Sequence, residues 1–195
     1  MENFADLYSD YLISSSSYAT STGMANLLSI KHDKITRELS NGDYDSKFLW
    51  KQSKVYVKEL TQSKELITLS FDDSIEEKRY TDESELHCWH FDHTFGKSVR
   101  GVNFLTALIE VGTMRLPCAV EFVKKDLWKK DPKTGKEKRK SSVSKNELFR
   151  KMLRECNGKF RFDYVLADSW YSSNENMNCC KKELNNDFIM ALKSN

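Results

Sequence analysis

The chain has 195 residues, and 31 lysines and arginines almost balance 29 acidic residues for a formal charge of +2, so its bulk charge indicates neither a strongly basic nucleic-acid-binding protein nor an acidic tail. Hydrophobic residues make up 39% and only nine residues are Gly or Pro, which excludes collagen-like and broadly disordered chains. No apolar window could span a bilayer and the acidic start Met1-Glu2-Asn3 does not resemble a signal peptide, which predicts a cytoplasmic protein.

Residues 1–62 predict a small helical region. Apolar residues recur at helical spacing in the first segment, at Phe4, Leu7, Tyr8, Tyr11 and Leu12. Further helical segments are expected around 24–28, 33–39 and 46–60. The stretch 25–39 has the proportions of a helix-turn-helix, with Lys34, Thr36 and Arg37 free to face a DNA groove, although any three-helix bundle offers such a pair.

From residue 64 onward the pattern becomes that of a sheet. The compact apolar run 66–71 predicts a buried strand that stops at Asp72 and Asp73. The runs 101–111 and 114–122 are separated by a Gly-Thr turn and predict a hairpin. Because Pro117 cannot donate a ladder hydrogen bond, the second of these strands should lie at a sheet edge.

Residues 124–140 carry nine Lys and Arg against three acids and predict a basic surface loop. Such a loop is either an ordinary solvated surface or a contact for DNA phosphates, and Trp128 within it either stacks on an unpaired base or anchors the loop. The candidate DNA-binding residues are Lys129, Lys130, Lys136, Lys138, Arg139, Lys140 and, farther along the chain, Trp170.

The last third of the chain alternates helix and strand. Ser144 and Glu147 form a capping-box pattern ahead of a helix that carries Leu148, Phe149, Met152, Leu153 and Cys156 on one face. A strand over 160–167 ends at Asp168, a helix capped by Ser172 and Glu175 follows, and 187–193 predicts a final strand. The expected order is three strands, helix, strand, helix, strand, which makes an α/β protein with a mixed sheet.

Two acids, Asp72 and Asp168, each follow the carboxyl end of a predicted strand. Open α/β sheets place their ligands at this edge, so the two carboxylates converge if the strands are neighbours. Carboxylate oxygens suit Mg²⁺ or Mn²⁺, the ions that work in pairs in phosphoryl transfer. The pattern therefore predicts a two-metal site, with Mg²⁺ or Mn²⁺ as cofactor.

A second possible metal site is weaker. His87, Cys88, His90 and His93 could supply nitrogen and sulfur ligands for zinc, but residues three apart in an extended segment point to opposite faces. A polar loop near the acidic site is the preferred interpretation. The five cysteines follow no CxxC spacing, so reduced and mostly buried thiols are expected.

Three stretches resemble one family. SFDDSIEEK around the first acid, WHFDHTFGKSVRGVNFLTALI at the hairpin and DYVLADSWYSSNENM around the second acid are similar to bacterial insertion-sequence transposases of the DDE type, in the IS-four-like group. The resemblance implies an RNase H-like catalytic domain over 63–195. It implies Asp72 as the first metal-binding acid, with Asp73 as the runner-up, and Asp168 as the second.

The resemblance also implies the reaction and the partners. In the family, water first attacks a DNA phosphodiester, and the freed 3′ hydroxyl then attacks a phosphodiester of the target, with two divalent metals activating the nucleophile and stabilising the leaving group. The implied partners are double-stranded DNA, both transposon ends and target, and a second copy or an intact transposase. The implied location is the nucleoid in a bacterial cytoplasm.

The family's third acid, a Glu on a helix after the last strand, has no match in the sequence. Glu110, Glu121, Glu175 and Glu183 all precede that position. The expectation is therefore a C-terminally truncated transposase that does not cleave DNA by itself. One alternative is a non-catalytic DNA-binding remnant that occupies transposon ends or pairs with an intact copy, and another is a different RNase H-fold nuclease.

Overall fold

The computed structural model describes residues 4–16, 18–132 and 135–192, and the chain forms two compact units, Met1–Tyr44 and Asp45–Asn195. The first unit contains α1 (Phe4–Ser14), α2 (Ser21–Leu27) and α3 (His32–Asn41), as the sequence predicts. The side chain of Thr20 caps α2 by accepting a hydrogen bond from Gly23 N. A small core of Phe4, Met24, Ala25 and Ile35 holds these helices together.

Helix α4 (Ser46–Leu60) belongs to the second unit, although the sequence grouped it with the N-terminal helices. Asp45 caps it by accepting from Lys47 N and Phe48 N. Its inner face packs on strand β4 and buries Val57 completely. The amphipathic pattern predicts the helix but not the surface on which it packs.

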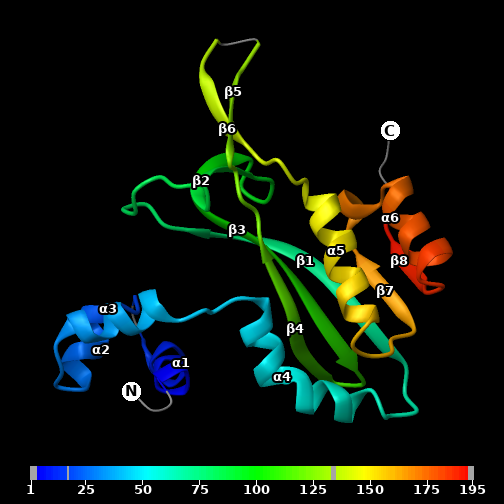
Figure 1. Cartoon of the computed structure of the whole chain (residues 1–195), viewed down its shortest axis with the longest axis horizontal. Coiled ribbons are helices and arrows are strands. Elements are labelled where there is room, and N and C mark those ends of the chain that lie inside the picture. Colours follow the sequence, from blue (N-terminus) through cyan, green and yellow to red (C-terminus); the bar gives the residue numbers. More distant parts are fainter. Residues whose placement is uncertain (1–3, 17, 133–134, 193–195) are drawn as a thin grey trace. The chain divides into compact units, whose positions relative to one another are not determined.

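A mixed sheet of six strands forms the centre of the second unit (Figure 1). The antiparallel strands are β1 (Ile67–Glu77), β2 (His87–Asp92), β3 (Lys97–Val111) and β4 (Met114–Phe122). The parallel strands β7 (Tyr164–Ala167) and β8 (Asp187–Met190) continue the sheet beyond β1. The strands lie in the order β4-β3-β1-β7-β8, with β2 beside the first part of β3, and the predicted α/β fold class with a mixed sheet is confirmed.

Strand β2 was not predicted, because the sequence indicated a loop over 87–93. It pairs with the first part of β3, while β4 pairs with the second part of the same edge. On the opposite edge of β3, the backbone of β1 approaches so closely at Gly101 that a Cβ there would lie 2.2 Å from the Glu76 carbonyl oxygen.

The predicted hairpin of β3 and β4 is present. Gly112 occupies its turn with φ of +57°, a conformation that glycine adopts without strain. Within the described residues β4 pairs with β3 alone, so Pro117 lies on an edge strand as expected. The register shifts beside Pro117, where Leu108 faces Pro117 but Ala107 faces Ala119.

Helix α5 (Lys145–Asn157) covers one face of the sheet (Figure 1). The predicted capping box of Ser144 and Glu147 is present, and the whole predicted apolar stripe is buried. After β7 come a short 3₁₀ turn (Ser169–Tyr171), α6 (Asn174–Asn178) and a π-helical segment (Cys179–Glu183). The cap of α6 is Ser173, one residue later than predicted.

Four strands differ in their bounds from the sequence prediction, and one of them, β3, begins at Lys97 rather than at Gly101. Strand β1 does not end at Asp72 but continues to Glu77, since β3 pairs with it over the whole length. Strand β7 begins at Tyr164 rather than at Phe160. Strand β8 ends at Met190, and residue 193 of the predicted final strand lies outside the described residues.

The basic segment forms a second sheet instead of a loop. Strands β5 (Leu127–Lys130) and β6 (Glu137–Lys140) make an antiparallel hairpin that projects from the six-stranded sheet (Figure 1). All five cysteines are free and buried, as the sequence predicts. In the described part of the chain, no helix has the length and apolarity needed to cross a membrane.

Candidate active site

The pairing of β1 with β7 brings Asp72 and Asp168 together. The two strands run parallel, and their last paired residues are Phe71 and Ala167. Asp72 and Asp168 are the next residues along each strand, so both carboxylates leave the sheet at the same level. The predicted convergence of the two acids is therefore a direct result of the register, even though β1 itself continues past Asp72.

One cavity of about 620 Å³ contains both acids. Its wall also includes the turn after β2 and the first residue of α5. The lining residues are Asp72, Asp73, Ser74, Ile75, Phe91, Asp92, His93, Thr94, Lys145, Asp168, Ser169 and Trp170. The cavity is thus strongly acidic on one side, with a single lysine among the described residues that line it.

The surroundings of Asp72 disfavour its negative charge. Partial burial raises the pKa of its carboxyl above the usual 3.8, and the charges of Asp73 and Asp168 raise it further. A hydrogen bond from the Asp73 backbone N–H and the charge of Lys145 act in the opposite direction without cancelling the effect. A cation between Asp72 and Asp168 would relieve this repulsion.

Asp168 begins a tight turn that presents its side chain to the cavity. One carboxylate oxygen accepts a hydrogen bond from Trp170 N at 2.8 Å, which fixes the start of the 3₁₀ turn. The ring of Trp170 lies at the cavity wall with its centroid 5.2 Å from that of His93. His93 in turn contacts Phe91, with ring centroids 4.9 Å apart. An aromatic rim therefore adjoins the acids.

Asp73 is held very differently from Asp72. Its side chain is only 18% exposed and forms an ion pair with Lys145. The hydroxyl of Tyr171 donates to its other oxygen at 3.0 Å, and Asn103 Nδ2 lies 3.5 Å away. Because its oxygens already have these partners, Asp73 is a poorer candidate metal ligand than Asp72.

The other acids considered from the sequence lie elsewhere. Glu110 accepts from Ser70 Oγ and pairs with Arg115, and Glu121 pairs with Lys151. Glu183 pairs with Arg154. Among the described residues, no group of three or more His, Cys, Asp or Glu side chains is arranged to hold a metal ion.

The histidine-rich segment has a structural arrangement. Both ring nitrogens of His87 contact backbone carbonyls, Nδ1 that of Asp82 at 2.9 Å and Nε2 that of Lys78 at 2.7 Å. The thiol of Cys88 lies 3.4 Å from His90 Nε2, and burial lowers the pKa of His90 to about 4. His87 thus holds the 78–87 connection to β2.

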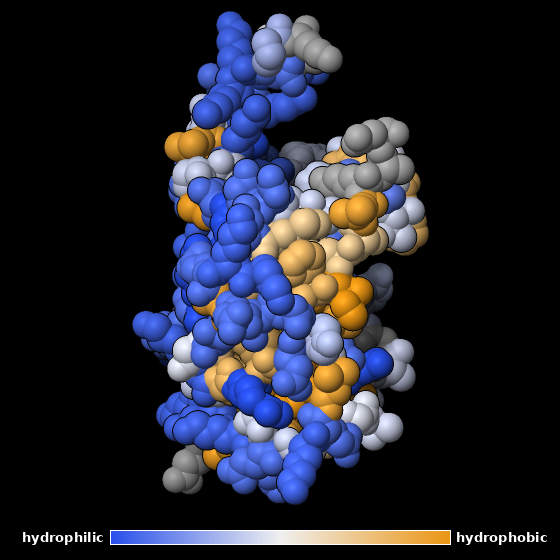
Figure 2. Space-filling view, turned by 90° about the vertical axis from the view of Figure 1, so that its right-hand side faces the viewer, coloured by the Kyte–Doolittle hydropathy of each residue, from blue (hydrophilic) through white to orange (hydrophobic). Residues whose placement is uncertain are grey.

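The basic hairpin carries most of the candidate DNA-binding residues, and Figure 2 shows it as a hydrophilic projection. Lys129, Lys130, Lys136, Lys138 and Lys140 are exposed. Arg139 differs, because its guanidinium pairs with Glu83 at 3.0 Å and lies 4.4 Å from the centre of the Trp128 ring. Arg139 and Trp128 therefore anchor the hairpin.

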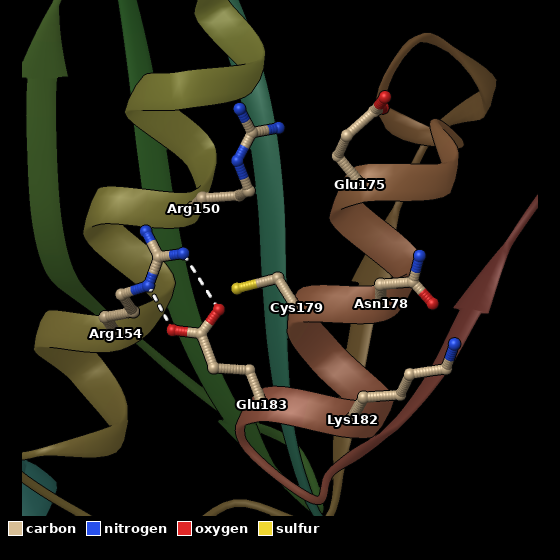
Figure 3. A pocket seen from close by; sticks show the side chains of 7 residues that line it. All are labelled: Arg150, Arg154, Glu175, Asn178, Cys179, Lys182 and Glu183. Carbon is tan, nitrogen blue, oxygen red and sulfur yellow. Dashed lines mark hydrogen bonds and ion pairs between the residues drawn. The ribbon is translucent and has the colours of Figure 1, made fainter.

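A second cavity, of about 490 Å³, lies between α5 and the helical segment 174–183 (Figure 3). Two arginines of α5 face Glu175 and Glu183 across it. Arg154 makes a two-point ion pair with Glu183, in which Nη2 lies 2.8 Å from Oε2. This cavity contains neither Asp72 nor Asp168, and its ion pair joins the two helices.

Sequence reasoning missed Asp92 and Lys145 as parts of the site, and it placed Tyr171 there only by its location just after Asp168. Asp92 ends the unpredicted strand β2, and its carboxylate accepts from Thr94 N and Phe95 N in the turn that lines the cavity. Lys145 is the first residue of α5. The capping box predicts where this helix begins, but it does not indicate which residue Lys145 contacts. Tyr171 lies beside Trp170 in the sequence, yet no periodicity indicates its contact with Asp73.

Comparison with known proteins gives a family and distant structural similarities. The family described as "DDE superfamily endonuclease" matches residues 2–195. No curated protein matches the chain significantly.

Two solved transposase complexes are similar to this chain at low scores. The Drosophila P element transposase strand transfer complex has 12% identity and a TM-score of 0.36, with 98% of this chain covered. The Mos1 strand transfer complex has 10% identity and a TM-score of 0.31, with 96% covered. The chain spans 41% and 57% of those two proteins, respectively.

Proposed function

We propose, since the chain belongs to the DDE superfamily of endonucleases, that it is the metal-binding core of a transposase that cleaves and joins DNA strands. The observation that supports this proposal is the placement of Asp72 and Asp168 at one level of neighbouring parallel strands. The narrower assignment to the IS-four-like group rests on the sequence stretches around these two acids. The proposed site of action is chromosomal DNA in a bacterial cytoplasm.

The residues of the site fit hard divalent cations. Asp72 and Asp168 line one cavity, and partial burial together with the charges of Asp73 and Asp168 raises the pKa of Asp72, so a divalent cation between the two carboxylates would be favourable. When bound there, Mg²⁺ or Mn²⁺ would activate the attacking oxygen and neutralise charge on the leaving oxygen of a phosphodiester. Trp170 and Phe91 would contact the DNA strands at the rim.

The β5–β6 hairpin is the proposed contact for DNA phosphates. Lys129 and Lys138 face each other across the two strands, and like charges in that arrangement destabilise a hairpin unless an anion lies nearby. Asp131 offsets only part of this charge through its contact with Lys138 at 2.7 Å. A DNA backbone would supply the remaining negative charge.

A non-catalytic DNA-binding chain is the second candidate function. The hairpin favours it, because DNA could bind to these lysines whether or not the acidic site supports cleavage. In this alternative the chain occupies transposon ends or pairs with an intact transposase. Cleavage that depends on both Asp72 and Asp168 would separate the first function from the second.

Iron-directed cleavage of the polypeptide tests the metal site. Fe²⁺ with ascorbate and peroxide generates radicals at a site that binds Mg²⁺, and these cut the backbone nearby. Cuts are expected near residues 72, 92–94 and 168–170, since these segments line one cavity. The cuts should disappear in Asp72→Ala and Asp168→Ala and persist in Glu121→Ala, which changes an acid paired with Lys151. Cuts that survive both aspartate substitutions would contradict the proposal.

A further inference from the structure

Asp73 joins three separate elements beside the metal-binding acids. It lies on β1, its ion-pair partner Lys145 begins α5, and Tyr171 ends the turn that Asp168 begins. Successive side chains of a strand point to opposite faces, so Asp73 points to the face covered by α5 and Asp72 to the other. Asp73 also lines the acidic cavity, but its carboxylate oxygens are already held by Lys145 and Tyr171.

Tyr171 is rigidly held. Its side chain is fully buried, and its ring stacks on Phe149 of α5 with centroids 5.3 Å apart and planes 24° apart. Phe149 also packs against Phe71, the residue before Asp72, with centroids 4.6 Å apart. The hydroxyl of Tyr171 would be buried without this partner if the Asp73 carboxylate were lost.

A second set of hydrogen bonds fixes the backbone of the same turn. Asn176 of α6 is fully buried and donates to the Tyr171 carbonyl at 2.9 Å and to Asn146 Oδ1 at 2.8 Å. Arg150 of α5 donates to Asn176 Oδ1 at 2.7 Å. Farther along, the ion pair of Arg154 and Glu183 joins α5 to the π-helical segment that follows α6 (Figure 3). The turn after Asp168 is thus attached to α5 as well as to β1.

We infer that Asp73, Lys145 and Tyr171 are positioning residues that set the separation of Asp72 and Asp168. Asp72 and Asp73 are adjacent on β1, and Asp168 and Tyr171 are the two ends of one short turn. The hydrogen bond from the Tyr171 hydroxyl to Asp73 therefore fixes the two metal-binding acids relative to each other. This inference rests on the proposed metal site, and it assigns the second acid of the Asp72-Asp73 pair a role distinct from the first.

The test measures Mn²⁺ affinity of the full 195-residue chain by calorimetry, together with thermal unfolding. Tyr171→Phe removes only the hydroxyl, and Asp73→Asn removes the charge while keeping an acceptor oxygen. Each should weaken Mn²⁺ binding about 10- to 100-fold, the usual effect of losing a residue that orients a metal ligand. Because both substitutions alter the same contact, the double variant should bind Mn²⁺ with nearly the affinity of whichever single variant binds less tightly.

Lys151→Met is the matched control. Lys151 also lies on α5 and pairs across elements with Glu121 at 2.6 Å, but it does not line the acidic cavity. This variant should bind Mn²⁺ as the wild type does, even if its melting temperature falls. A merely structural network would lower the melting temperature of Tyr171→Phe without changing its Mn²⁺ affinity.

Mn²⁺ binding by the variants and by the wild type distinguishes a wrong positioning role from a wrong metal site. Wild-type affinity in folded Tyr171→Phe and Asp73→Asn, with binding lost in Asp72→Ala, would overturn the positioning role alone. No Mn²⁺ binding by the folded wild-type chain would overturn both claims. If Tyr171→Phe does not fold, Asp73→Asn gives the same comparison, since Asn is close to Asp in size.

Discussion

Asp72 and Asp73 are adjacent acids with opposite surroundings. Asp73 has a lysine, a tyrosine hydroxyl and an amide beside its carboxylate. Within the described residues, the Asp72 carboxylate accepts a hydrogen bond only from the Asp73 backbone N–H, and burial together with the charges of Asp73 and Asp168 raises its pKa. The folded protein therefore surrounds the Asp73 carboxylate with polar partners and disfavours the negative charge of Asp72, which marks Asp72 as a candidate functional residue.

Replacing Asp72 by Asn should stabilise the metal-free protein at neutral pH. The raised pKa means that ionising this carboxyl costs more in the folded than in the unfolded state. The cost is absent well below pH 3.8, where the group is protonated in both states, and is complete above the raised pKa. With a chelator present, Asp72→Asn should melt at a higher temperature than the wild type at pH 7 and at the same temperature near pH 3.

Glu77→Gln on the same strand is the control for this prediction. A hydrogen bond from Arg79 lowers the pKa of Glu77, so removal of its charge should not stabilise the protein at pH 7. A lower melting temperature for Asp72→Asn than for the wild type at pH 7 would show that the Asp72 charge is not disfavoured in the folded protein.

At the scale of elements, apolar patterns predicted the buried segments and missed the polar ones. The stripe of α5 and the capping box at Ser144 are present because both are local signals. Strand β1 continues through Asp72 to Glu77 without apolar alternation, since pairing with β3 rather than burial holds it there. Strands β5 and β6 consist largely of lysines and other polar residues, so no hydrophobic period indicates them.

The β5–β6 hairpin should provide a salt-dependent contact with DNA. Lys129→Gln and Lys138→Gln should weaken binding to duplex DNA of any sequence. Each lost phosphate contact should reduce the slope of log affinity against log salt by about 0.9. Fluorescence anisotropy measures this slope when DNA affinity is determined at several salt concentrations between about 50 and 300 mM.

Two lysines of α4 provide the control for the hairpin prediction. Lys54 and Lys58 are exposed on a helix of the same unit, so Lys54→Gln with Lys58→Gln changes the net charge equally. This control should alter the salt slope little. Equal slopes for the hairpin pair and the α4 pair would show that the hairpin is not a specific phosphate contact.

At the scale of the whole molecule, the sequence predicted that each acid follows a strand, and the pairing of β1 with β7 places Asp72 next to Asp168. That result follows from topology, because parallel neighbours end at the same edge of the sheet. The contacts of Asp73 with Lys145 and Tyr171 had no signal in the sequence, since they join residues 72 and 98 positions away. The amphipathic pattern of α4 also did not show that it packs on β4 rather than with α1–α3.

The central claim is that Asp72 and Asp168 together bind a divalent metal ion. Its most direct test is calorimetric titration of the 195-residue chain with Mn²⁺, alongside Asp72→Ala, Asp168→Ala and the control Glu121→Ala, with folding of each checked by circular dichroism. We expect the wild type and Glu121→Ala to bind Mn²⁺ and both aspartate variants to lose binding. Equal binding by all four proteins, or no binding by the folded wild type, would contradict this claim.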